Sequence, residues 1–270
     1  MEKIDRIGLI AGSGKFPLFL ANAARLNNVE VVVFAVNSEA DKEIEKKVNK
    51  VYWLNLGEGK KLIEAIKAED LKYITMAGKI SKLTLIRESL RLDEEARKLM
   101  GRLTDRRDDT ILKAIAGRLK EIGVEVLDST IFLKSMMPPK GLLTKRKPDK
   151  REAEDIEFGF KIAKEMGGLD IGQSVVIKDK AVIAVEAIEG TDEAIRRAGR
   201  LSGPGSVVVK VSKPDQDLRF DVPVVGLTTI ESLKEAQASC LAIEADRVMV
   251  LEKEEVIKEA DKAGIAIIVV

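Results

Sequence analysis

The sequence predicts an α/β protein with a doubly wound parallel sheet in its N-terminal half and a mixed α/β domain in its C-terminal half. Three observations support this prediction. Apolar, β-branched runs alternate with segments of helical spacing in the first half. A chain of 270 residues is near the length at which single cores stop growing, which favours two domains. A stretch rich in proline and basic residues interrupts the pattern near the middle.

In the N-terminal half, strand and helix patterns follow one another with short connections. Residues 7–11 form an apolar run that ends in a glycine turn, and helical spacing begins at Pro17. Residues 29–36 are almost purely apolar, as in a strand buried on both faces of a parallel sheet. The same patterns predict helices over 58–68 and 109–121 and strands over 73–77 and 124–127. This alternation implies right-handed crossovers within one parallel sheet.

The periodic pattern breaks between residues 136 and 151, where prolines and like charges gather. We therefore place an N-terminal domain at 1–136 and a C-terminal domain at 137–270. The second half opens with a helix over 152–166, followed by a hairpin of strands 174–177 and 181–188. The remaining predicted elements are a helix at 192–201, a strand at 206–211, a helix at 229–238, a strand at 241–245 and a final strand, helix and strand ending at 270.

The composition excludes several classes of enzyme. The chain has no histidine, which excludes Ser-His-Asp hydrolases, His-ligated zinc centres and a histidine general base. Its single cysteine, Cys240, lies in an apolar setting and is expected to be a small core residue. The 46 basic and 45 acidic side chains nearly cancel, so we expect no nucleic-acid partner. With no apolar stretch of about 20 residues, the sequence predicts a cytoplasmic protein.

Two glycine-containing turns follow predicted strands of the first half. Gly12, Ser13 and Gly14 lie at the carboxyl end of the first strand and before a helix, where phosphate-binding turns occur. Pro17 stands where the dinucleotide fingerprint has its third glycine, so that motif is incomplete. Gly78 and Lys79 end a neighbouring strand, so Lys79 is a candidate phosphate ligand. A plain tight turn and a solvated lysine are the alternatives.

A second candidate region lies where a strand of the C-terminal half meets a helix. Gly190 and Thr191 follow the acidic residues Glu186 and Glu189, and Asp192 comes next. Thr191 is a good helix N-cap, and a preceding glycine allows a phosphate to approach the N-terminus of the helix. A capped helix with acidic side chains near its dipole accounts for Asp192, but it does not account for carboxylates at the end of a strand.

A polar loop from Lys210 to Pro223 contains three aspartates, two lysines and one arginine. Carboxylate oxygens bind Mg²⁺ together with substrate oxygens, while Lys and Arg neutralise charge that develops on phosphorus. The loop is therefore typical of a site for a divalent metal and a phosphate. The alternative is a charged loop that is merely solvated.

Blocks at 8–17, 77–79, 169–176, 184–192 and 213–223 together resemble the LpxI family, the UDP-2,3-diacylglucosamine pyrophosphatases of lipid A biosynthesis. The resemblance covers nearly the whole chain in order. It implies a Rossmann-like N-terminal domain, a C-terminal domain of unusual fold and a requirement for a divalent cation, typically Mg²⁺. It also implies attack of water at the α-phosphorus, which gives UMP and 2,3-diacylglucosamine 1-phosphate (lipid X).

A catalytic aspartate of that family falls in the block that contains Asp217 and Asp221, and we keep both residues as catalytic candidates. We hypothesise that both bind the cation, with Glu189 as a third ligand. The sequence departs from the family pattern at Asp215, Leu227 and Asp246, which affects local loop shape. The residues expected to contact substrate or phosphate are Gln173, Glu189, Gly190, Thr191, Asp192, Lys210, Lys213, Arg219, Gly12, Ser13, Gly14, Gly78 and Lys79.

The expected partner is a glycolipid nucleotide, with no nucleic acid involved. The basic residues between Lys145 and Arg151 form either a contact with the cytoplasmic face of the inner membrane or a solvated linker. A homodimer is plausible for a small α/β enzyme. A non-catalytic nucleotide- or ligand-binding module is the alternative function. An NAD-dependent oxidoreductase is disfavoured, because Asn37 and Ser38, not an acidic residue, follow the second strand.

Overall fold

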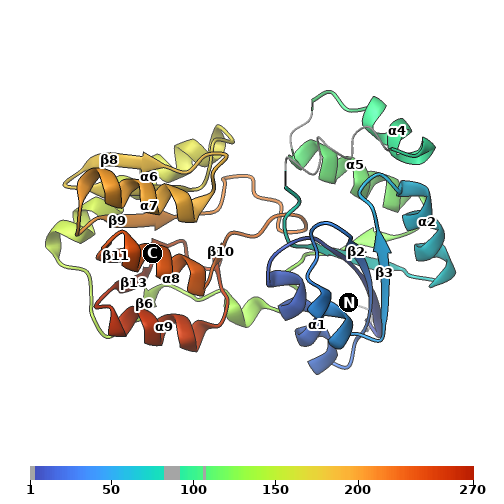
Figure 1. Cartoon of the computed structure of the whole chain (residues 1–270), viewed down its shortest axis with the longest axis horizontal. Coiled ribbons are helices and arrows are strands. Elements are labelled where there is room, and N and C mark those ends of the chain that lie inside the picture. Colours follow the sequence, from blue (N-terminus) through green and yellow to red (C-terminus); the bar gives the residue numbers. More distant parts are fainter. Residues whose placement is uncertain (1–3, 82–91, 106–107) are drawn as a thin grey trace. The chain divides into compact units, whose positions relative to one another are not determined.

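A computed structural model of the chain describes residues 4–81, 92–105 and 108–270. The chain forms two compact units (Figure 1). Unit 1 comprises Met1–Leu133 and Leu218–Asp221, and unit 2 comprises Lys134–Asp217 and Val222–Val270. The predicted fold class, α/β with one parallel sheet and one mixed α/β part, is confirmed. The short segment that the second half contributes to unit 1 was not foreseen from the sequence.

The sheet of unit 1 is parallel throughout and has the strand order β3-β2-β1-β4-β5. Its strands are β1 (Arg6–Ala11), β2 (Glu30–Val36), β3 (Lys50–Leu54), β4 (Tyr73–Ala77) and β5 (Glu125–Val126). β2 is buried over six of its seven residues, as its apolar sequence predicts. β3 was missed because it is an edge strand whose residues are only half-buried or exposed, so it lacks a continuous apolar run. β5 is shorter than the predicted strand.

Helices cover the sheet of unit 1. They are α1 (Phe16–Leu26), α2 (Gly59–Ala68), α4 (Glu94–Gly101) and α5 (Asp108–Glu121), with a 3₁₀ helix at Lys42–Lys46. Ile66 of α2 and Leu119 of α5 pack in one core with Phe34 and Ile74 of the sheet. α1 packs on β1, β2 and β4. α4 was not predicted; it is short, and none of its residues is fully buried.

The sheet of unit 2 is mixed, with the strand order β6-β13-β11-β9-β7-β8. Its strands are β6 (Gly141–Leu142), β7 (Ser174–Lys178), β8 (Ala181–Val185), β9 (Val207–Lys210), β11 (Cys240–Ile243) and β13 (Ala266–Val269). The strands β9, β11 and β13 are parallel, while β7 runs antiparallel to both β8 and β9. The predicted hairpin is thus confirmed. β6 lies inside the predicted linker, and a short separate pair joins β10 (Val224–Val225) to β12 (Met249–Val250).

Helices cover both faces of this sheet, because its strands alternate two sets of apolar side chains. Val207 and Val209 pack with α6 (Lys150–Gly168), whereas Val208 and Leu241 pack with the three remaining helices. These are α7 (Thr191–Ser202), α8 (Leu227–Glu235) and α9 (Lys253–Lys262). A capping box formed by Asp149 and Glu152 starts α6 two residues before the predicted position. Figure 1 shows α7, α8 and α9 along one side of unit 2.

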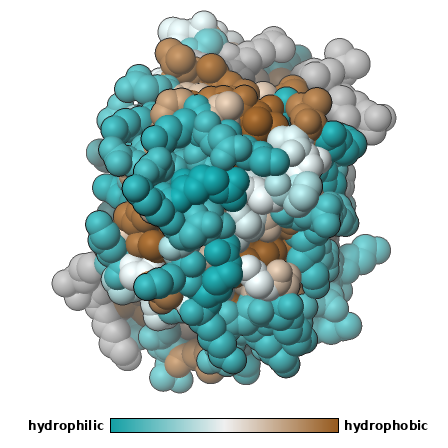
Figure 2. Space-filling view, turned by 90° about the vertical axis from the view of Figure 1, so that its left-hand side faces the viewer, coloured by the Kyte–Doolittle hydropathy of each residue, from teal (hydrophilic) through white to brown (hydrophobic). Residues whose placement is uncertain are grey.

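Cys240 is fully buried in β11, and burial raises the pKa of its thiol to about 12, so its predicted role as a core residue is confirmed. Within the described ranges, no helix is long and apolar enough to cross a membrane. The face that Figure 2 shows is mostly hydrophilic, with hydrophobic side chains gathered toward its top. The exposed large hydrophobic residues include Leu26, Leu142, Leu169, Ile171, Val182, Ile188 and Leu201.

Candidate active site

The two glycine turns of unit 1 bind each other through their backbones. The N–H of Ser13 donates to the carbonyl of Lys79 over 2.8 Å, and the N–H of Lys79 donates back to Ser13 over 3.1 Å. A Cβ atom on Gly12 would lie 2.5 Å from the carbonyl oxygen of Lys79, and one on Gly78 would lie 2.6 Å from that of Ser13. Glycine is therefore required at both positions by the close approach of the two turns.

This pairing changes how the first turn could bind a phosphate. The N–H of Gly12 donates to Ala77, and that of Ser13 donates to Lys79, so both amides are used within the fold. A phosphate contact at this turn would then use Gly14, whose φ is +90°, or the exposed side chain of Lys79. The predicted contact at this edge stays a prediction.

The aspartate loop reaches the same edge of unit 1. The carbonyl of Leu218 accepts hydrogen bonds from the N–H and hydroxyl of Ser129, over 3.1 and 2.6 Å. Phe220 is 7% exposed and packs in the core that includes Phe34. Ser129 follows β5, which pairs in parallel with β4. The segment Leu218–Asp221 therefore lies at the carboxyl ends of the strands, on the edge that also carries both glycine turns.

Arg219 and Asp221 belong to this unit 1 segment, whereas Asp217 belongs to unit 2. The guanidinium of Arg219 stacks over the ring of Phe220, 4.8 Å from its centroid. The two candidate aspartates thus stand on either side of the point where the chain passes from one unit to the other. Their separation along the chain is four peptide bonds, counted from residue 217 to residue 221.

In unit 2, an ion pair fixes the backbone of the loop that leads to Asp217. The ammonium of Lys164 lies 2.9 Å from the carboxylate of Glu244, and the two charges bind opposite ends of one residue, Ser212. Glu244 accepts the N–H of Ser212 over 2.7 Å, and Lys164 donates to its carbonyl over 2.8 Å. The turn that follows is closed by the side chain of Gln216, which accepts the N–H of Lys213 over 3.0 Å.

A buried chain of hydrogen bonds lies at the carboxyl end of β9. It joins Lys210, Thr191 and Glu186. The ammonium of Lys210 donates to the hydroxyl oxygen of Thr191 over 2.8 Å, and that hydroxyl donates to Glu186 over 2.9 Å. Their exposed fractions are 5%, 8% and 8%. Ser174, the register partner of Lys210 on β7, lies 3.3 Å from the same hydroxyl. We call these four residues the Lys210 cluster.

The N-terminus of α7 differs from the prediction in one respect. Gly190, with a φ of +85°, is the N-cap, and Thr191 is the first helical residue. The Thr191 hydroxyl therefore serves the Lys210 cluster instead of capping the helix. Beside it, Oδ1 of Asp192 and Oε1 of Gln173 are buried acceptors without a hydrogen-bond partner in the described part of the chain. Buried polar atoms are nearly always paired, so these two acceptors are open to a hydrogen-bond donor from outside the chain.

Two further predicted site residues of unit 2, Glu189 and Lys213, each form an ion pair. The carboxylate of Glu189 pairs with Arg197 over 2.6 Å, and its pKa is lowered by backbone N–H groups and by that guanidinium. Lys213 pairs with Asp170 over 2.5 Å. Among residues 4–81, 92–105 and 108–270, no three His, Cys, Asp or Glu side chains are grouped so as to hold a metal ion.

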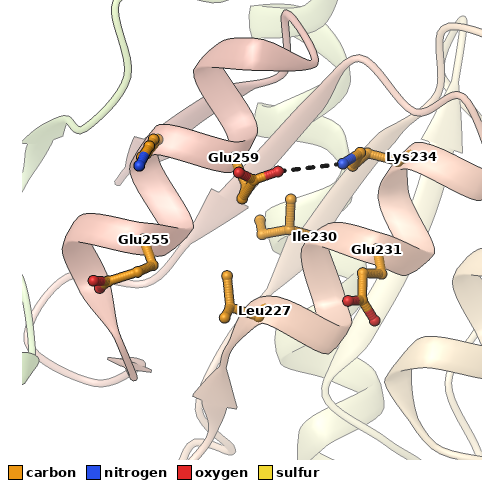
Figure 3. A pocket seen from close by; sticks show the side chains of 7 residues that line it. Leu227, Ile230, Glu231, Lys234, Glu255 and Glu259 are labelled. Carbon is orange, nitrogen blue, oxygen red and sulfur yellow. Dashed lines mark hydrogen bonds and ion pairs between the residues drawn. The ribbon is translucent and has the colours of Figure 1, made fainter.

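A groove between α8 and α9 lies apart from the predicted residues. Leu227 and Ile230 form its apolar part, and its volume is about 310 Å³. Figure 3 shows charged side chains around it, including Lys234 and Glu259, which pair over 3.4 Å. None of the predicted site residues lines this groove.

The sequence missed the residues that support the site. Ser174 lies within one of the blocks that carry the family resemblance, but nothing marked its hydroxyl as part of a cluster. Lys164 and Glu244 are 80 residues apart, the first on a predicted helix and the second within a predicted strand. No local pattern connects them, so only the fold could reveal the pair.

Comparison with known proteins places both halves in one family. The LpxI N-terminal domain matches residues 6–136, and the LpxI C-terminal domain matches residues 139–268. A relative from Caulobacter vibrioides, named UDP-2,3-diacylglucosamine pyrophosphatase LpxI, is 30% identical over 274 aligned positions. The alignment covers 97% of this chain and 96% of the relative.

Solved structures show only remote similarity. The biotin carboxylase domain of a Hydrogenobacter thermophilus 2-oxoglutarate carboxylase aligns with a TM-score of 0.28 and 11% identity, over 75% of this chain and 42% of that one. A transformylase from Mycobacterium tuberculosis aligns with a TM-score of 0.25 and 13% identity, over 67% and 44%. This chain thus spans less than half the length of either structure.

Proposed function

This chain belongs to the LpxI family, and we propose that it hydrolyses the pyrophosphate bond of UDP-2,3-diacylglucosamine. In this reaction the oxygen of water bonds to the α-phosphorus, and the bond from that phosphorus to the bridging oxygen breaks. The products are UMP and 2,3-diacylglucosamine 1-phosphate, and a proton is released to solvent. The match to a curated pyrophosphatase of this name over nearly the full length of both chains supports the proposal.

The Lys210 cluster is the observation that carries the proposal. It places a buried ammonium against the first residue of α7, whose leading N–H groups have no partner within the helix. An ammonium and a helix N-terminus both favour phosphate oxygens. The unpaired acceptors on Gln173 and Asp192 suit hydroxyl or N–H donors, which a sugar nucleotide carries.

Exposed apolar side chains next to this cluster suit a substrate with acyl chains. Leu169 and Ile171 lie on the segment that leads to Gln173, and Ile188 precedes Glu189. Their exposed fractions are 72%, 46% and 83%. The two segments touch, because a Cβ atom on Gly172 would lie 2.2 Å from the carbonyl oxygen of Glu186. Apolar and phosphate-binding groups thus lie on the same edge of unit 2.

Asp217 and Asp221 are the proposed ligands of a divalent cation, with Mg²⁺ as the first choice. Carboxylate oxygens suit Mg²⁺, which proteins often bind through one or two carboxylates and the phosphates of the substrate. Glu189 stays the predicted third ligand, and it would share its carboxylate with Arg197, which donates to Oε1 over 2.6 Å. When bound, such a cation supplies positive charge that polarises the phosphoryl group. In a chain without histidine, the same two carboxylates are the candidates to orient the attacking water and accept its proton.

Further expectations from the sequence stay predictions: the cytoplasmic location, the homodimer and the peripheral membrane contact. Two arginines of the basic segment have structural roles, since Arg146 pairs with Glu152 over 2.7 Å and Arg151 donates to the carbonyl of Gly205 over 3.1 Å. A membrane contact by this segment would therefore rest on its exposed lysines.

The direct test is hydrolysis of UDP-2,3-diacylglucosamine in ¹⁸O water, with Mg²⁺ or with EDTA, read by mass spectrometry. We expect UMP that carries ¹⁸O, formed only with the metal. Intact substrate in both samples from a folded protein would refute the proposal and favour a non-catalytic ligand-binding module. Label in the lipid phosphate would instead place the attack on the other phosphorus.

Asp221→Asn and Asp217→Asn identify the essential carboxylate. We expect the variant of the essential residue to lose on the order of 10²-fold or more in kcat, a loss typical of groups that stabilise the transition state. Asp215→Asn is the matched control in the same loop, because Asp215 is exposed and has no proposed role. Far-UV circular dichroism should be unchanged in all three. Near-normal turnover in both Asp221 and Asp217 variants would contradict the assignment.

A further inference from the structure

We propose that Glu186 is a positioning residue that acts on phosphate binding through the Thr191 hydroxyl and the Lys210 ammonium. The inference rests on the proposed function, in which Lys210 contacts a phosphate of the substrate. Glu186 carries the same charge as the phosphate, so a direct contact would be repulsive. Its place at the end of the hydrogen-bond chain from Lys210 gives it a different role.

The direction of the hydrogen bonds around Thr191 follows from the chemistry of a hydroxyl. A hydroxyl has one hydrogen to donate and two lone pairs that accept. The hydrogen points to Oε1 of Glu186 over 2.9 Å, so the lone pairs accept from Lys210 over 2.8 Å and from Ser174 over 3.3 Å. All positions on the Thr191 oxygen are filled, which fixes the hydroxyl and directs a lone pair at the ammonium.

Burial explains why a carboxylate stands at the far end of the chain. Lys210 is 5% exposed, and a buried ammonium is costly unless a nearby negative charge compensates it. Glu186, itself 8% exposed, supplies that charge through the hydroxyl. The carboxylate accepts from the Thr191 hydroxyl, which in turn accepts from the ammonium, so Glu186 is linked through Thr191 to a basic group at the N-terminus of α7.

The backbone holds Glu186 firmly in this place. Its N–H donates to the carbonyl of Ser174 over 2.9 Å. Its carbonyl lies against Gly172, where a Cβ atom would be 2.2 Å away. The N–H of Gln173 approaches Oε2 of Glu186 at 3.4 Å. The Glu186 carboxylate is therefore the fixed end of the hydrogen-bond chain, and the orientation of the Lys210 ammonium depends on it.

The test is a double-mutant cycle between Glu186→Gln and Lys210→Met, with kcat and KM measured for each variant. Glutamine keeps an acceptor for Thr191 but removes the charge. We expect Glu186→Gln to lower kcat/KM about 10-fold, the scale of one hydrogen bond to a charged group, and to have little further effect in the Lys210→Met background. An equal loss in both backgrounds would overturn the inference.

Thr191 supplies a second, independent comparison. Thr191→Val removes the hydroxyl at nearly constant shape and should lose about as much as Glu186→Gln, whereas Thr191→Ser should restore activity. Equal activity of the valine and serine variants would contradict the chain of hydrogen bonds. Glu157→Gln is the matched control: Glu157 lies on α6, is 75% exposed and pairs with Lys161, so we expect no change.

Binding of UDP, measured by calorimetry, separates this inference from the proposed function. If the wild-type chain binds UDP but does not hydrolyse the glycolipid, the proposed function fails, and the same cycle read as Kd still decides the role of Glu186. Wild-type turnover combined with additive losses would leave the function standing and overturn the inference alone. A folded wild-type chain that neither binds UDP nor turns over substrate would overturn both.

Discussion

Glu69 is one residue whose side chain joins three parts of unit 1. It follows the last turn of α2 and is 5% exposed. Its carboxylate pairs with Arg6 over 2.6 Å and with Lys50 over 2.5 Å, and it accepts the hydroxyl of Tyr52. Hydrogen bonds from Lys50 and Tyr52, and then from Arg6, hold the pKa of Glu69 at about 2. The residue therefore ties α2 to the amino-terminal ends of β1 and β3.

This lowered pKa predicts a contribution to acid stability. The folded pKa of about 2 lies below the ordinary value of 4.5, so the contribution is complete above pH 4.5 and is lost as the pH falls toward 2. We expect Glu69→Gln to lower the free energy of unfolding at pH 7, with a difference from wild type that shrinks below pH 4.5. Urea unfolding at several pH values between 7 and 3 measures it.

The control for this prediction is Glu64→Gln on the exposed face of α2, where Glu64 is 62% exposed and lies 3.8 Å from Lys60. Exposed pairs contribute little, so this variant should unfold like the wild type at every pH. A Glu69→Gln difference that stays constant from pH 7 to pH 3 would rule out the titration of Glu69 as its cause.

The role of a single residue could be predicted from the sequence where that role depends on the residues next to it along the chain. Cys240 lies in an apolar run, and the structure buries it as expected. Lys210 and Thr191 were selected because each stands where a strand ends or a helix begins. The hydrogen bond between them could not be predicted, because it requires knowing that β7 pairs with β9 and brings α7 beside Lys210.

At the scale of elements, the path of the loop after β9 depends on α6 and β11. Lys164 from α6 and Glu244 after β11 bind the carbonyl and the N–H of Ser212, so both ends of that residue are fixed. The two charged side chains are 28% and 17% exposed. Partial burial makes this pair stronger than a surface ion pair and makes the loss of one partner costly.

We therefore expect Lys164→Met to destabilise the chain by about 1–3 kcal/mol, below the full cost of breaking a fully buried pair. Because the loop leads to Asp217, kcat should fall together with stability. Thermal unfolding and steady-state kinetics measure the two effects. Lys161→Met is the control, since Lys161 on the same helix is 73% exposed and pairs with Glu157. Kinetics of Lys164→Met that match those of the control would contradict a role for this pair in loop geometry.

The strands that are most buried were the ones most readily predicted from the sequence. The sequences of β2 and β4 are apolar because both strands are largely buried, so their patterns are strong. β3 and β6 are edge strands with half-buried or exposed residues, so neither shows a clear pattern. β6 is also only two residues long and pairs with β13, more than 120 residues later. Such pairing follows from the fold and not from local sequence.

At the scale of the whole molecule, neither unit is one continuous segment of the chain. The second half of the chain contributes Leu218–Asp221 to unit 1 and then returns to unit 2. A boundary drawn from composition divides a chain once and cannot represent such an excursion. Phe220 is an apolar residue in a charged loop, but its partners Phe34 and Ile74 lie in the other half of the sequence. One candidate catalytic residue, Asp221, is thereby tied to the core of unit 1.

Phe220→Ala in the intact chain tests this arrangement. Removing a phenylalanine that is 7% exposed should cost about 3–5 kcal/mol, and the loss should fall on unit 1 because Phe220 packs only in that unit's described core clusters. Hydrogen exchange followed by mass spectrometry should then show faster exchange in β1, β2 and β4, with β9 and β11 unchanged. Leu233→Ala, which opens the core beneath α8, should give the reverse pattern. If Phe220→Ala accelerated exchange in β9 and β11 as much as in β1 and β4, then the two units would unfold together, and the segment's attachment would stabilise the whole chain instead of one unit.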